Sequence, residues 1–273
     1  MELLLKSILG QPSPLVLLLY GTHGTELPGS IYVARRLASS IGLANPLAVV
    51  DLIGPVSPWA CRRGYRYDRY LSDPNRFYIK DNANLAELTH FLALWQKHKP
   101  KSRKELVCFF QESDLYGLHL DSVFQMGQAS FPGLPGFVHL KIQQRRVSYL
   151  VQLMLKRHSL MNFSSIVLLD VHAGIGQHAS TRIFYSRRKD AQERPFLVDI
   201  LAARLESLTR CSVQAMISET GVINNEAGMI DALSELAFRT HGYSDQRNLQ
   251  LKAMDYHWKA KVAHYLELQF AVY

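Results

Sequence analysis

The sequence has few cysteines, and those it has do not suggest pairing. Cys61, Cys108 and Cys211 are odd in number and lie far apart among the 273 residues. A disulfide framework needs an even set and a cysteine-based zinc site needs close spacing, so the sequence predicts neither. A reducing, cytoplasmic compartment is the simplest interpretation.

The sequence also lacks an apolar run long enough to cross a membrane. Its first such run, PLVLLLY at 14–20, falls well short of the roughly 20 residues that a spanning helix needs. Pro12 and Pro14 interrupt the region around it, so we expect neither a signal peptide nor a membrane partner. Repeats and low-complexity tracts are absent, and the length suits one hydrophobic core, so a single domain over 1–273 is expected.

Negative charge is in deficit, and the net charge is +8. Much of the excess lies in four basic clusters, at 62–69, 98–104, 141–146 and 187–189. Such clusters suit a nucleic-acid surface, the walls of a pocket for an anionic substrate, or a solvated face. Because no helix-turn-helix, RNA-recognition or zinc-finger signature accompanies them, nucleic acid ranks third.

Short apolar runs alternate with stretches of helical periodicity along the chain. The predicted strands are at 14–20, 47–53, 105–110, 164–171 and 213–218. The predicted helices are at 27–40, 84–98, 147–160, 196–208, 226–239 and 249–268. This alternation predicts an α/β fold, with a mostly parallel or mixed central sheet and helices on both faces. In such folds the active site follows the carboxyl ends of the strands.

Polar side chains follow the first predicted strand directly, in YGTHGTELPG at 20–29. His23 and Glu26 lie three residues apart on a turn that enters a helix, so both can reach one ion. Gly21 and Gly24 let the backbone turn tightly there. A helix start with an incidental histidine is the alternative, and this short motif taken alone favours it.

The fourth apolar run ends in DVHAGIGQH at 170–178. Asp170 and His172 are two residues apart on a strand and share a face, and a carboxylate beside a histidine ligand fixes its tautomer. A solvent-facing histidine is the alternative. With His23 and Glu26, however, His172 makes a set of two histidines and one carboxylate. That is the ligand count of a catalytic zinc site whose fourth position is open to water.

Two further candidates are Glu219 and Tyr185. Glu219 ends the fifth apolar run, where a carboxylate suits the general base that takes a proton from the attacking water. An acid at the start of the next helix is the alternative. Tyr185 is a phenolic donor over the pocket or, more simply, an aromatic residue of a strand.

An arginine-rich segment follows the second predicted strand, at 62–78. Asn75 and Arg76 pair an amide with a fork-shaped cation, which suits a substrate carboxylate. Other arginines of this segment could polarise a scissile carbonyl or bind the substrate; they are Arg62, Arg63 and Arg69. A surface loop would also explain so many arginines.

Taken in order, these motifs resemble the zinc carboxypeptidase superfamily, which includes carboxypeptidase A-type peptidases. The segment 21–30 is similar to its Gly-x-His-Gly-x-Glu motif, and 170–176 to its Asp-Leu-His-Thr-Gly-Leu-Gly. The fragment DPNRF at 73–77 resembles Asp-Leu-Asn-Arg-Phe, with Pro74 in place of leucine. The triplet at 219–221 matches the segment that carries the catalytic glutamate.

Two branches of this superfamily compete. The Arg62–Arg63 pair and the loop at 127–137 resemble a less characterised carboxypeptidase-like bacterial branch. The run RYLSDPNR at 69–76 resembles the aspartoacylase/succinylglutamate desuccinylase branch. The extra C-terminal β-domain of aspartoacylases is not evident, because 249–268 predicts helix.

The resemblance implies one Zn²⁺ ion held by three ligands, which are His23, Glu26 and His172. It implies that Glu219 is the base, that Asn75 and Arg76 hold a substrate carboxylate, and that Arg62 or Arg63 aids the oxyanion. The predicted function is a zinc hydrolase that cleaves an amide bond next to a free carboxylate. It would act on peptide C-termini as a metallocarboxypeptidase, or on N-acyl amino acids as a deacylase. A non-catalytic binding protein on the same fold is the further alternative, and the sequence leaves the oligomeric state open.

Overall fold

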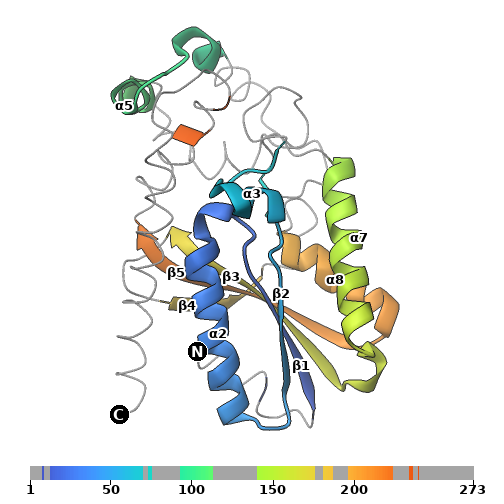
Figure 1. Ribbon diagram of the computed structural model, residues 1–273. Coiled ribbons are helices and arrows are strands. Elements are labelled where there is room, and N and C mark those ends of the chain that lie inside the picture. Colours follow the sequence, from blue (N-terminus) through green and yellow to red (C-terminus); the bar gives the residue numbers. More distant parts are fainter. Residues whose placement is uncertain are drawn as a thin grey trace.

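The computed structural model describes residues 8, 13–69, 73–75, 93–112, 140–175, 181–186, 196–223, 234–235 and 239. A five-stranded sheet with the order β2-β1-β3-β5-β4 organises this part of the chain (Figure 1). Its strands are β1 (Pro14–Leu19), β2 (Val49–Ile53), β3 (Ser165–Ile175), β4 (Thr181–Tyr185) and β5 (Ser212–Ile223). The first three and β5 pair in parallel, whereas β4 is antiparallel to β5. The predicted fold class is confirmed.

Helices cover both faces of the sheet. Helix α2 (Leu27–Ala44) covers one face, and α7 (Leu140–Arg157) and α8 (Leu197–Thr209) cover the other. The remaining described helices are α3 (Pro58–Arg63) and α5 (Arg103–Glu112), with the 3-10 helices η1 (Gly24–Glu26) and η2 (Leu160–Asn162). Alternate residues of β1 sort the core: Leu15, Leu17 and Leu19 pack with α7 and α8, whereas Val16 and Leu18 pack with α2. Every residue of β1 is buried, as expected of a central strand that is covered on both faces.

The strand predicted at 105–110 is wrong, because this segment lies inside the helix α5. Leu106 and Phe109 are buried at helical spacing, while Cys108 between them is exposed. Ser102 and Glu105 also cap the helix: the Glu105 N–H donates to Ser102 Oγ at 3.2 Å, and Glu105 Oε2 accepts from the Lys101 N–H. This Ser-x-x-Glu spacing is a helix-start signal that outweighs a short apolar run.

The sheet still has five strands, because β4 completes it at one edge. The apolar runs did not predict β4. The predicted helices at 84–98 and 226–239 lie mostly outside the described residues, and that at 249–268 lies entirely outside them. Where the first two are described, at 93–98, 234–235 and 239, the chain is helical. None of the helices in the described ranges combines the length and hydropathy that a bilayer crossing requires.

Candidate metal centre

Parallel pairing brings the carboxyl ends of β1, β3 and β5 to one edge of the sheet. Leu19 of β1 pairs with Asp170, and His172 of β3 pairs with Glu219 of β5. Side chains alternate along a strand, so Asp170, His172 and Glu219 share the face that α7 and α8 cover. The turn after β1 enters this edge from the neighbouring strand.

That turn packs tightly against the segment around α3. Gly21 has a φ of +67°, a left-handed conformation that favours glycine. The Gly24 N–H donates to the Tyr65 carbonyl at 2.7 Å, and a Cβ on Gly24 would lie 2.2 Å from the Ala60 carbonyl oxygen. The close approach fixes the backbone between His23 and η1 and directs the side chains of this turn toward β3.

His23, Glu26 and His172 form one buried group, with exposures of 2%, 4% and 3%. Glu26 Oε1 lies 2.9 Å from His23 Nδ1, and Glu26 Oε2 lies 3.1 Å from His172 Nδ1. Ligand atoms from the three residues all fall within 4.8 Å of one another. Two imidazole nitrogens and one carboxylate at this separation can hold one metal ion.

Each of the two histidines presents its other nitrogen to a carboxylate. His23 Nε2 lies 2.9 Å from Asp73 Oδ1, and His172 Nε2 lies 3.0 Å from Asp170 Oδ2. Thr22 Oγ1 donates to Asp170 Oδ1 at 2.8 Å and holds that carboxylate in place. Carboxylates behind both histidines leave the Nδ1 atoms as ligand donors, the arrangement that orients metal-binding imidazoles. Sequence reasoning missed Asp73, although this residue opens the DPNRF fragment that also contains Asn75.

Arg66 is the arginine that the structure brings to this group. Its NH1 lies 3.4 Å from Glu26 Oε1 and its NH2 lies 3.3 Å from Asp73 Oδ2. Burial disfavours the charged form of Arg66 and lowers its pKa, but Asp73 and Glu26 outweigh this effect and raise the pKa of Arg66 above its ordinary value. Sequence reasoning missed Arg66 because it is one of several arginines in the run at 62–69.

The other predicted arginines lie elsewhere. Arg62 and Arg63 are exposed on α3, and the Arg63 guanidinium lies 4.5 Å from the centroid of the Trp59 ring. Arg69 is exposed at a separate pocket. Arg76 lies outside the described residues.

Asn75 and Tyr185, both predicted to bind substrate, lie in different places. Asn75 is buried, with Nδ2 3.3 Å from His172 Nε2 and Oδ1 accepting the Leu197 N–H at 3.3 Å. Its amide therefore contacts a candidate ligand and the start of α8. Tyr185 pairs with Met216, which packs in the α2 cluster, so Tyr185 belongs to the sheet face opposite Glu219 and is half exposed.

Glu219 lies beside His172 in the sheet and keeps part of its surface exposed. Burial raises the pKa of Glu219 to about 7, and the neighbouring Glu26 adds to the rise while His172 opposes it. A carboxyl group with a pKa near neutrality at the edge of a cluster is suited to accept and return a proton.

The charges around the histidines favour a cation. Burial disfavours ionisation of Glu26, yet His23 and His172 hold the pKa of Glu26 well below its ordinary value. Burial likewise opposes protonation of His172, but Asp170 and Glu26 raise its pKa well above its ordinary value. Among the described residues, the carboxylates of Glu26, Asp73 and Asp170 and the guanidinium of Arg66 surround the two imidazoles. Their charges sum to about −2 when both imidazoles and the Glu219 carboxyl group are neutral. A divalent ion fits this donor set and this charge.

Glu235, which is distant in the sequence, binds the loop that carries Arg66 through its carboxylate. Glu235 accepts the backbone N–H of Arg66 at 2.5 Å and that of Tyr67 at 3.1 Å. Arg239 lies 3.3 Å from the same carboxylate and donates to the Asp68 carbonyl at 2.6 Å. Burial raises the pKa of Glu235 to about 7, against the opposing effect of these donors. No local sequence pattern predicted this support.

Comparisons with known proteins give little beyond this geometry. No protein-family model matches the chain, and no curated protein matches it. Among solved structures, the chain is similar to a succinylglutamate desuccinylase/aspartoacylase family protein from Shewanella amazonensis SB2B, with a TM-score of 0.32 and 15% sequence identity. The match covers 85% of this chain and 65% of that one. So distant a likeness carries no functional argument. The function proposed below rests on the buried group of His23, Glu26 and His172, which we call the metal group.

Proposed function

We propose that this chain is a zinc-dependent hydrolase that cleaves an amide bond next to a free carboxylate. The observation that carries the proposal is the buried His23, Glu26 and His172 group with a carboxylate behind each histidine. Two histidines and one carboxylate are the protein ligands of hydrolytic zinc sites, which keep one position open. When bound, the ion would supply a Lewis acid for the attacking water and for the carbonyl of the substrate.

The residues of the chain have separate roles in this proposal. Asp73 accepts a hydrogen bond from His23, and Asp170 lies 3.0 Å behind His172 Nε2, so both imidazoles have their Nδ1 atoms toward the ion. Glu219 takes the proton of the attacking water and returns it to the leaving nitrogen, a role that its pKa of about 7 suits.

Arg66 is the proposed donor to the developing oxyanion, in place of Arg62 and Arg63. Its two terminal nitrogens face Glu26 and Asp73, and its buried Nε has no hydrogen-bond partner among the described residues. A guanidinium fixed in this way is oriented before the reaction begins, as stabilisation of an oxyanion requires. Arg76 remains the proposed clamp for the substrate carboxylate.

Two substrate classes follow from the same chemistry, C-terminal peptide bonds and N-acyl amino acids. The test is a screen of both classes with zinc-loaded protein, comparing wild type with Glu219→Gln. We expect hydrolysis of at least one class and a loss of about 10²- to 10⁴-fold in the variant, the usual contribution of a general base. Amidating the substrate's carboxylate should abolish hydrolysis. Equal rates for wild type and Glu219→Gln, or no turnover of either class, would contradict the proposal.

A further inference from the structure

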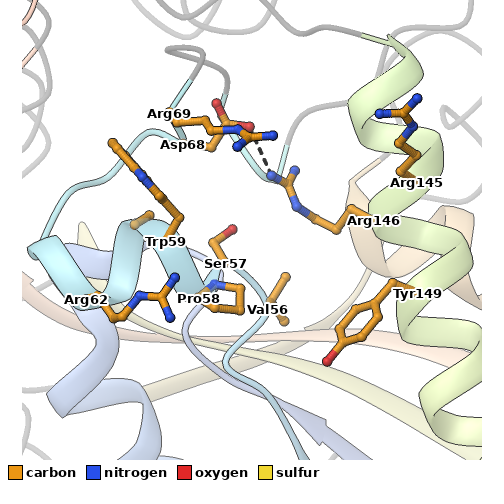
Figure 2. A pocket seen from close by; sticks show the side chains of 11 residues that line it. Val56, Ser57, Pro58, Trp59, Arg62, Asp68, Arg69, Arg145, Arg146 and Tyr149 are labelled. Carbon is orange, nitrogen blue, oxygen red and sulfur yellow. Dashed lines mark hydrogen bonds and ion pairs between the residues drawn. The ribbon is translucent and has the colours of Figure 1, made fainter.

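A cavity lies between α3 and α7 (Figure 2). Its volume is about 440 Å³, within the range of pockets that hold small molecules. None of the three candidate metal ligands lines it. Its walls come from the segment before and within α3, from the loop at 68–69, and from one side of α7. It is therefore separate from the proposed catalytic group.

Positive charge dominates the lining of this cavity. Among the described residues, its lining contains four arginines and one acid, which are Arg62, Arg69, Arg145, Arg146 and Asp68. Their formal charges leave an excess of three positive charges around a small volume. Within the described part of the chain, neither Arg62 nor Arg145 has an ion-pair partner, and both are exposed to solvent.

Arg146 differs from these two because its side chain is only 10% exposed. Its NH2 lies 3.0 Å from Asp68 Oδ2, and its NH1 donates to Gln143 Oε1 at 2.6 Å. Burial nevertheless lowers the pKa of Arg146, although Asp68 opposes the change. A second anion beside this guanidinium would offset more of the cost of its burial.

Ser57 supplies an independent observation that points to a polar ligand. The residue is 4% exposed, lines the cavity, and has an Oγ without a hydrogen-bond partner among the described residues. A buried hydroxyl left without a partner costs about 1–3 kcal/mol. In Figure 2 this hydroxyl points into the space between Arg62 of α3 and Arg146 and Tyr149 of α7.

We propose that this cavity binds a small phosphate-bearing molecule with at least two negative charges. A phosphate group offers more oxygens than a carboxylate, so it can accept paired bonds from more than one guanidinium and one from a serine hydroxyl. A charge of −2 or more also matches the excess on the walls, which a single carboxylate would leave largely uncompensated. The proposal does not depend on the hydrolase reaction.

The test is calorimetric titration of the full chain with inorganic pyrophosphate near physiological salt. The pocket variant carries Arg62→Gln and Arg145→Gln, both at exposed positions. The control carries Arg35→Gln and Arg36→Gln, which are exposed on α2 and change the net charge equally. We expect one site in wild type and control, and binding at least about tenfold weaker in the pocket variant, because each substitution there removes charge-assisted hydrogen bonds to the phosphate oxygens.

Further measurements decide between local and general effects. Ser57→Ala should weaken pyrophosphate binding several-fold without altering charge. Equal affinity in wild type, pocket variant and control would overturn the proposal, as would equal weakening in both double variants, which would indicate net charge alone. Tighter binding of tricarballylate than of pyrophosphate would overturn the phosphate assignment. The phosphate assignment would also be overturned if duplex DNA displaced pyrophosphate and bound more tightly than it, with the same dependence on Arg62 and Arg145.

Discussion

Gly174 offers a steric probe of the metal group that leaves every ligand in place. A Cβ on Gly174 would lie 2.7 Å from Glu26 Oε1 and 2.9 Å from its Cδ. Ordinary contact begins near 3.4 Å, so the carboxylate of Glu26 must retreat by about 0.7 Å, the difference between 3.4 and 2.7 Å. The atom that must move, Glu26 Oε1, makes the 2.9 Å contact with His23 Nδ1, so the shift alters that contact. Metal–ligand distances hold to about 0.2 Å, so a shift of this size disrupts coordination.

Gly174→Ala should therefore lower zinc affinity by about 10- to 100-fold, the range seen when the groups that orient a ligand are removed. Gly42→Ala in α2 is the matched control, because a Cβ there meets nothing within 4 Å. The control should keep wild-type affinity and gain up to about 1 kcal/mol of stability from helix propensity. Affinity is measured by competition with a chromophoric chelator, and folding by urea unfolding. Zinc affinity of folded Gly174→Ala within twofold of wild type would refute the reasoning.

Three other substitutions probe the surroundings of the metal group. Asp73→Asn should weaken zinc binding about 10- to 100-fold in the chelator assay, because Asp73 orients His23, whereas Asp51→Asn at a remote histidine contact should have no effect. Arg66→Met should lower the free energy of unfolding of the metal-free protein, measured in urea, by about 3–5 kcal/mol, because it leaves two buried carboxylates without their cation. Arg66→Lys should recover only part of this loss, and unchanged stability in Arg66→Met would count against these ion pairs. The pKa of Glu235 is about 7 in the folded chain and 4.5 ordinarily. Between pH 4.5 and 7 the folded chain therefore binds a proton that the unfolded chain has released, so stability falls as the pH rises through this range. Relative to Glu235→Gln, wild type should lose about 3 kcal/mol between pH 4.5 and 8 at 1.36 kcal/mol per pH unit, and parallel pH profiles for the two proteins would disprove the assignment.

The strand-end residues could be predicted from the sequence because one physical rule connects them. His23, Asp170, His172 and Glu219 each follow or end an apolar run, and parallel strands place their carboxyl ends at one edge. Their spacing within each run then decides which face they share. The prediction needed only strand identity and direction, which continuous buried runs indicate well.

The supporting residues could not be predicted, because contacts distant in sequence position them. Arg66 does not differ locally from its neighbouring arginines. Glu235, which holds its backbone, is 169 residues away along the chain. Asp73 belongs to a recognisable motif, but only the fold shows that its carboxylate faces His23. The error at 105–110 was different, since Ser102 and Glu105 carried a local helix signal that the apolar run obscured.

Metal content tests the central claim most directly. Protein purified without chelator is analysed for zinc by mass spectrometry, alongside His172→Ala and, as a control, His158→Ala, whose histidine contacts Asp51 away from the group. We predict about one zinc per chain in wild type and in the control, and almost none in His172→Ala. Wild-type protein that carries no zinc and takes up none on addition, or equal zinc in all three proteins, would contradict a metal centre at His23, Glu26 and His172.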